Sequence, residues 1–118
     1  MPVKPAAFLE TAALLVISGT EECDFRSAVS RAYYAAFHAV KWKTSGAVVY
    51  SGGNEHSIAL NHVTNRWLED LARDFTTLQD RRIEADYYLD ESVSKGRAEF
   101  LLKKARRFVE HVYTKSVT

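Results

Sequence analysis

Apolar residues recur at helical spacing along almost the whole chain. The clearest series follows i, i+3, i+4 spacing within one long segment: Phe25, Ala28, Val29, Ala32, Tyr33, Ala36, Phe37 and Val40. A second complete series lies near the C-terminus: Ala98, Leu101, Leu102, Ala105, Phe108, Val109 and Val112. Together with cap residues such as Pro5, Gly19 and Asn54, the pattern predicts helices over 5–18, from the caps at 20–24 to near 46, and over 54–74, 77–89 and 94–114.

Breaks between these segments are few, which favours a helical bundle. Both prolines, Pro2 and Pro5, lie in the first five residues, and the chain has only five glycines. Brief connections, including a loop over 47–53, predict an all-α, antiparallel up-and-down bundle of four long helices and one short fourth helix. We expect residues 1–118 to form a single domain. Alanines from Ala28 to Ala39 indicate that the second helix approaches a neighbour closely.

Composition removes several classes of function. Sixteen basic and fifteen acidic residues give a net charge of +1, so nucleic-acid contact would require a local patch. A single cysteine, Cys23, excludes an internal disulfide and a multi-cysteine zinc site. His56 and His62 lie roughly 120° apart around a helix, a poor metal pair, so no metal or cofactor is predicted. The longest apolar run, Ala12–Ile17, is too short to span a bilayer, and we expect a cytoplasmic protein.

Two motifs carry a family resemblance. The segment Ser30-Arg-Ala-Tyr-Tyr34, followed by Phe37-His38, and the later element Arg82-Ile-Glu-Ala-Asp86-Tyr87 resemble the HEPN domain family of small prokaryotic helical proteins. The resemblance covers nearly the whole chain and implies a four- or five-helix bundle, usually dimeric. It also implies pairing with a small nucleotidyltransferase in a toxin–antitoxin system. Several members are metal-independent ribonucleases, and others are described as nucleotide-binding.

The chain departs from the family's ribonuclease signature at one position. That signature is an Arg, four to six residues and then a His, often followed by a Tyr one residue further on. The corresponding segment here runs from Arg81 through Asp86 to Tyr88, with Asp86 where the His would stand. An ionised Asp cannot donate a proton to a leaving oxygen as an imidazolium can. The resemblance also makes Tyr88 a possible site of nucleotidylation by the partner enzyme; the plain alternative is a packed tyrosine.

Arg31 and His38 match the signature's spacing elsewhere, on the second helix. Seven positions separate them, so they share one helix face about 10 Å apart along the axis. They belong to a polar stripe: Ser27, Arg31, Tyr34, His38 and Lys41. As a site, Arg31 would hold a phosphate while His38 or Tyr34 supplied a proton or hydrogen bond. As structure, Arg31 would pair with an acid on a neighbouring helix and His38 would donate a satisfied hydrogen bond.

Arg82 and Asp86 are spaced i, i+4 and predict at least a local ion pair. They also suggest a polar network with Arg31 and with Tyr33 or Tyr34, between the second and fourth helices. As structure this network would fix helix register, and as a site it would also line a nucleotide pocket. Tyr87 belongs to the same element.

The run Lys103-Lys104-Ala-Arg106-Arg107 places four cations on the last helix. It is either a solvated face near a helix C-terminus or a phosphate patch for RNA. We therefore expect a HEPN-type module that binds a nucleotide or a nucleotidyltransferase partner; the alternative is a metal-independent endoribonuclease using Arg31 and His38. Aromatic residues near helix ends (Trp42, Tyr50 and Trp67) favour a homodimer.

Overall fold

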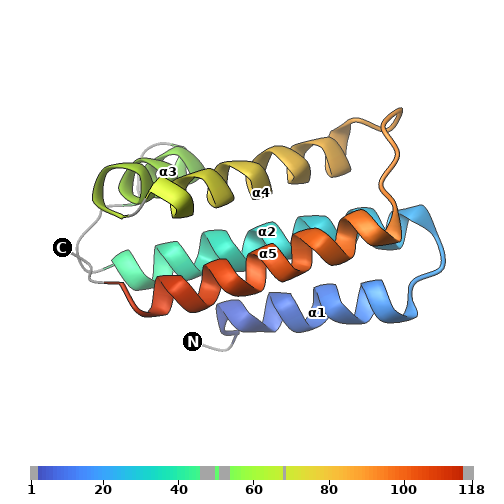
Figure 1. Cartoon of the computed structure of the whole chain (residues 1–118), viewed down its shortest axis with the longest axis horizontal. Helices are drawn as coiled ribbons and strands as arrows, with labels where there is room; N and C mark the ends of the chain where they lie inside the picture. Colours follow the sequence, from blue (N-terminus) through green and yellow to red (C-terminus); the bar gives the residue numbers. More distant parts are fainter. Residues whose placement is uncertain (1–2, 46–49, 51–53, 68, 116–118) are drawn as a thin grey trace.

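A computed structural model describes residues 3–45, 50, 54–67 and 69–115, and this part of the chain contains helices and no strands. The helices are α1 (Pro5–Ser18), α2 (Glu22–Thr44), α3 (Glu55–Arg66), α4 (Glu69–Tyr87) and α5 (Lys95–Tyr113). They form a bundle that measures 42 × 27 × 26 Å (Figure 1). None of the described helices is long and apolar enough to cross a membrane. The all-helical fold is confirmed, whereas the antiparallel order of the whole bundle stays a prediction.

Helix α2 lies at the centre and contacts each of the other helices. In Figure 1 it runs beside α5 through the middle of the bundle, with α1 on one side and α3 and α4 on the other. The five alanines from Ala28 to Ala39 are at most 1% exposed, so the prediction of close approach is confirmed. Larger side chains also fill the core between helices, including the fully buried Phe75 of α4 and Phe108 of α5, whose ring centroids lie 5.5 Å apart. The small residues of α2 therefore let its neighbours pack closely around one helix.

The short helix is α3, not the fourth helix, so the predicted boundary over 74–77 was wrong. Helix α4 continues through that point because Leu71, Phe75 and Leu78, at i, i+4 and i+7, are at most 2% exposed and keep one face in the core. The β-branched threonines there cost only tenths of a kcal/mol in a helix, which this packing overrides. Helix α3 ends instead at Trp67, whose extended backbone (φ −115°, ψ 179°) leaves the helical region.

Other helix ends follow the sequence closely. Asn54 accepts hydrogen bonds from the backbone N–H groups of His56 and Ser57, as expected of an N-cap. Helix α2 ends at Thr44, slightly before the predicted end near 46. The loop predicted over 47–53 falls outside the described residues except for Tyr50, whose hydroxyl lies 2.7 Å from that of Thr44.

Candidate functional site

Two clusters of polar and aromatic side chains lie along α2, one on the side facing α4 and one on the side facing α1. The sequence stripe supplies Arg31 and His38 to the α1 side, whereas positions outside the stripe supply the α4 side, because a helix places neighbouring positions about 100° apart. Residues 26, 30 and 33 face α4 and α3, whereas 31 and 38 face α1. Tyr34 lies between the two clusters and contacts both.

The cluster facing α4 is a polar network centred on Arg82. Its guanidinium forms an ion pair with Asp86 (Nε to Oδ2, 3.0 Å) and donates a hydrogen bond to the Tyr34 hydroxyl (2.7 Å). Ser30 donates to the same Asp86 oxygen at 3.2 Å. The predicted ion pair and network between the second and fourth helices are thus present, with Ser30 as a member that sequence reasoning missed.

Arg31 and Tyr33 enter this network differently from the prediction. Arg31 contributes no hydrogen bond to it within the described residues, and its guanidinium lies over the Tyr34 ring instead. Tyr33 lies under the Arg82 guanidinium at 5.9 Å, and its hydroxyl bonds to Nδ1 of His56 on α3. Burial raises the pKa of the fully buried Tyr33, against the opposing effect of Arg82. Burial also lowers the pKa of His56, and Arg82 lowers it further.

The cluster facing α1 consists of Arg31, Tyr34, His38 and Phe8. The Arg31 guanidinium carbon lies 4.8 Å from the Tyr34 ring centroid and 5.7 Å from that of Phe8, within range of cation–π attraction. The His38 ring stacks on Phe8 with centroids 5.2 Å apart and planes 11° apart. Burial lowers the pKa of His38, with a further contribution from Lys41. The imidazole is therefore neutral near pH 7 and able to accept a proton.

Within the described part of the chain, neither Arg31 nor His38 has the structural partner that the sequence suggested. The Arg31 guanidinium makes no ion pair or hydrogen bond there, and the His38 ring makes aromatic contacts and electrostatic interactions with nearby charged groups but no hydrogen bond. The last member of the stripe, Lys41, does have a partner, since its Nζ lies 2.7 Å from the Glu55 carboxylate. A half-buried arginine held over two rings, with its donors unused, is suited to an external anion.

A pocket of about 470 Å³ opens beside this cluster, between the first turns of α1 and the last turns of α2. It is lined by Val3, Pro5, Phe8, His38, Lys41, Trp42 and Ser45. Two aromatic side chains, Phe8 and Trp42, offer surfaces for a flat ring, and His38 and Lys41 offer polar groups. The volume is in the usual range for small-molecule sites.

The segment that aligns with the ribonuclease signature is divided in space. Asp86 turns toward Arg82 and Ser30, whereas Arg81 pairs with Glu84 (2.9 Å). Arg81 lines a separate cavity of about 290 Å³ near the α4–α5 connection, together with Tyr88. Tyr87 and Tyr88 are 66% and 54% exposed, so neither is the packed tyrosine of the plain alternative.

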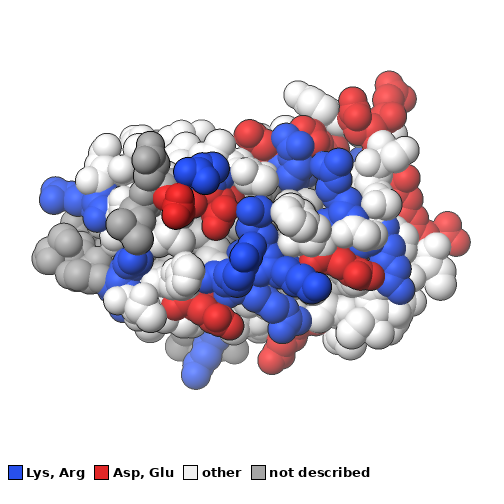
Figure 2. Space-filling view, in the orientation of Figure 1, with Lys and Arg blue, Asp and Glu red and all other residues white. Residues whose placement is uncertain are grey.

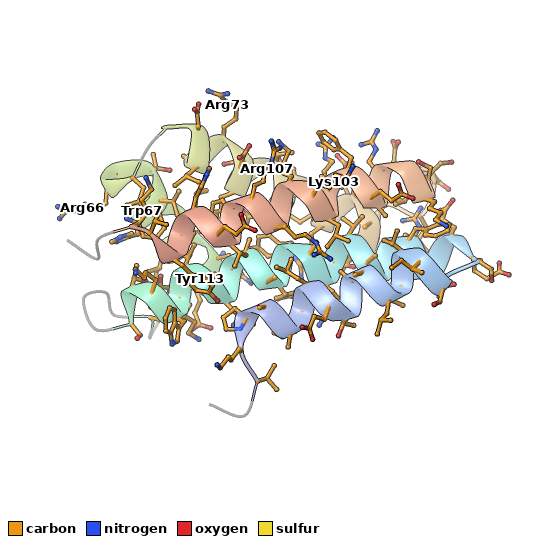
Figure 3. All side chains as sticks on the ribbon, turned by 60° about the horizontal axis from the view of Figure 1, so that its bottom comes forward. Arg66, Trp67, Arg73, Lys103, Arg107 and Tyr113 are labelled. Carbon is orange, nitrogen blue, oxygen red and sulfur yellow. The ribbon has the colours of Figure 1, made fainter. Side chains whose placement is uncertain are left out.

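The basic run on α5 is partly neutralised. Lys104 forms an ion pair with Asp74 on α4 at 3.1 Å and lies over the Phe100 ring. Lys103, Arg106 and Arg107 are exposed and make no ion pair within the described residues. Figure 2 shows Lys and Arg side chains gathered over the course of α5, and Figure 3 labels Lys103 and Arg107 along that helix.

Arg26 is the main polar residue that sequence reasoning missed. It is 8% exposed, and its guanidinium donates to backbone carbonyls of Ala85 (2.9 Å) and Glu91, and more weakly to others near the end of α4. It thereby joins α2 to the α4–α5 connection. The available signal was its spacing, since positions 26, 30 and 33 share the face of α2 that carries the polar network.

A family model for the HEPN domain matches residues 6–115, nearly the whole chain. The chain belongs to the HEPN domain family. The match spans both motifs from which the resemblance was drawn, as well as all the helices except the first residue of α1. A sequence search among curated proteins found no match. In this HEPN domain, the described residues include no group of three or more His, Cys, Asp or Glu side chains placed to hold a metal ion.

Proposed function

We propose that this HEPN domain binds a nucleotide, with the phosphate at Arg31 and the base in the pocket between α1 and α2. The observation that carries the proposal is the Arg31 guanidinium, which has no ion pair in the described chain yet is held over Tyr34 and Phe8. Phe8 also lines the pocket, so an anion at Arg31 and a ring in the pocket would be adjacent. The base would stack on Phe8 or Trp42, and neutral His38 would accept or donate a hydrogen bond.

Isothermal titration with nucleoside mono- and triphosphates tests this site. We expect Arg31→Gln to weaken binding about tenfold or more, because a charge-assisted contact to phosphate is lost. The matched control is Arg73→Gln, since Arg73 lies on α4 and pairs with Asp70 at the exposed surface. Absence of nucleotide binding, or equal losses in the two variants, would contradict the proposal.

The second part of the proposal is that the domain works as the binding half of a toxin–antitoxin-like pair with a small nucleotidyltransferase. The exposure of Tyr88 supports it, because a transferase needs access to its acceptor residue. Coexpression with candidate nucleotidyltransferases, followed by intact-mass measurement, tests it. We expect a nucleotidyl mass increase that Tyr88→Phe removes and Tyr113→Phe retains. No increase and no copurification would count against the pairing.

A ribonuclease remains the second candidate because Arg31 and His38 lie together against Phe8. Arg31 would bind the phosphate, and His38, whose pKa is lowered by burial, would act as the general base for a ribose 2′-hydroxyl. His38→Ala would then abolish cleavage of a fluorescent RNA oligonucleotide. Cleavage that is unchanged in this variant, or absent from the intact protein, would leave nucleotide binding alone.

We also propose that the protein is an antiparallel bundle that forms a homodimer. Trp42, one of the aromatic residues on which that prediction rests, is 48% exposed. Light scattering at micromolar concentration measures the mass directly, and a monomer there would remove the dimer from the proposal.

A further inference from the structure

Helix α1 is apolar on the side that faces away from the bundle. Its sequence from Pro5 to Ser18 contains one charged residue, Glu10. Leu14 and Ile17 are 65% and 73% exposed, although a helix that is apolar on all sides is normally covered. This outer side of α1 is therefore an incomplete packing surface.

The exposed apolar side of α1 borders a groove of about 390 Å³ between α1 and α5. Its apolar residues are Ala13, Val16, Ile17 and Leu102. Its charged rim comes from α5 and consists of Lys95, Glu99, Lys103 and Arg106. Positions 95 to 106 span about 16 Å along a helix, which is three turns. The groove therefore has the length of a short docked helix.

The rim is electropositive, and its cations have no ionic partner in the part of the chain that the structure describes. Lys95, Lys103 and Arg106 form no ion pair or hydrogen bond through their side chains in the described residues, and Glu99 is the one acid among the lining residues. Lys95 is also the first residue of α5, where the helix dipole adds positive potential. An apolar floor with three free cations on its rim suits an occupant that is apolar on one face and acidic on the other.

We propose that the groove between α1 and α5 binds an amphipathic helix with an acidic polar face, supplied by a partner protein. The apolar face of that helix would cover Ile17 and Leu102, and its carboxylates would meet Lys103 and Arg106. This is the helix-in-groove mode of recognition, in which apolar side chains at positions i, i+3 or i+4 and i+7 of the bound helix lie in the groove. A second copy presenting the same face would bring a second set of the same cations, so self-association fits the charges less well. The site does not include Arg31 or its pocket, and it does not depend on nucleotide binding.

A designed peptide pair measures the specificity directly by fluorescence anisotropy. The test peptide has leucines at three successive turns of one face and glutamates on the flanks, and the control peptide replaces each glutamate with lysine. We expect saturable binding of the acidic peptide only, weakened by 0.5 M NaCl because salt screens the exposed rim charges. We expect Lys103→Glu combined with Arg106→Glu to weaken binding about tenfold or more. Ile17→Ser should also weaken it, through lost apolar contact.

The matched control combines Arg66→Glu with Arg73→Glu, which reverses two exposed arginines on α3 and α4 (Figure 3). Circular dichroism verifies that each variant folds. Equal binding of the two peptides, or equal losses in the rim and control variants, would overturn the proposal. So would a dimer that light scattering detects and Ile17→Ser dissociates. Binding to phosphatidylglycerol vesicles that needs Ile17, without binding of the acidic peptide, would assign the groove to a lipid surface instead.

Discussion

Replacing Arg26 with methionine tests the inferred link between α2 and the α4–α5 connection. The side chain of Arg26 is 9% exposed and makes its bonds mainly to backbone carbonyls that lie beyond the last intrahelical bonds of α4. Of these, the Ala85 and Glu91 carbonyls accept no backbone hydrogen bond in the described residues, whereas the Glu84 and Tyr88 carbonyls also accept from the N–H groups of Tyr88 and Glu91. Methionine keeps much of the apolar stem and removes the guanidinium, so the substitution measures the bonds rather than a cavity.

The expected loss follows from the two shorter carbonyl contacts, to Ala85 and Glu91. Hydrogen bonds to charged groups contribute about 1.5–3 kcal/mol each, and the remaining contacts, at 3.3–3.4 Å, are weak. We take the lower end of this range, about 1.5 kcal/mol, for each of the two bonds. The α4–α5 connection is exposed, so water can replace part of the lost hydrogen bonding. The free energy of unfolding should therefore fall by about 3 kcal/mol. For 118 residues this corresponds to a decrease in Tm of about 12 °C.

Urea unfolding followed by circular dichroism gives the free energy, and hydrogen exchange locates the change. Exchange should accelerate most for amides in the segment from Tyr88 to Val93, next to the released carbonyls. Glu22→Gln is the control: Glu22 is the side-chain partner of Arg26 among the described residues, and it is 47% exposed, so its loss should cost less than about 1 kcal/mol. A loss below about 1 kcal/mol in Arg26→Met, with unchanged exchange over 88–93, would refute the reasoning.

Three further predictions concern the polar and titratable groups of the two clusters along α2. Tyr33→Phe removes the buried bond to His56 Nδ1 and should lower the free energy of unfolding by about 1–2 kcal/mol, measured by urea unfolding; no change would mean that the bond contributes nothing. Asp86→His breaks the ion pair with the 17%-exposed Arg82 and should destabilise the fold without creating RNA cleavage, measured on a fluorescent oligonucleotide; new cleavage would contradict this. Finally, stability should fall between pH 7.5 and 5.5. Burial lowers the pKa of His38 and His56 in the folded state, so below about 6.5 the unfolded chain binds protons that the folded chain does not. The double variant His38→Gln, His56→Gln should show a smaller decrease, and an equal decrease would contradict the assignment.

Sequence reasoning located most helix ends because those ends depend on local chemistry. Pro5 at the start of α1 and Asn54 before α3 act through their own backbone and side chain. The boundary between α3 and α4 was different. Nothing local marks Trp67 as a terminus, and the threonines at 76 and 77 resemble a break more closely. The packing of Phe75 against Phe108 of α5 carries α4 across that point, and such a contact is not encoded in either segment alone.

The sequence predicted many of the residues of the candidate site, but not their separation into two clusters. The spacing of Arg31 and His38 placed both on one face, and both do stack on Phe8. That Phe8 of α1 supplies the second ring could not be read from α2. The Arg82–Asp86 pair was predictable because i, i+4 positions are neighbours on any helix. Its bonds to Ser30 and Tyr34 required knowing how α2 and α4 align.

The sequence by itself determined that this is a helical HEPN domain with a cation, an imidazole and a tyrosine along its second helix, because periodicity and motif spacing are properties of one segment. Tertiary structure decided which of these groups are neutralised. Lys41 and Lys104 form ion pairs with acids on other helices, and Arg82 forms one with an acid one turn further along its own helix. Arg31 instead contacts two aromatic rings and no acid in the described chain. Charge pairing acts over a few ångströms, so it depends on which helices become neighbours and in what register. The same dependence left α1 with an apolar side beside three free cations, a surface that no single segment of the sequence contains.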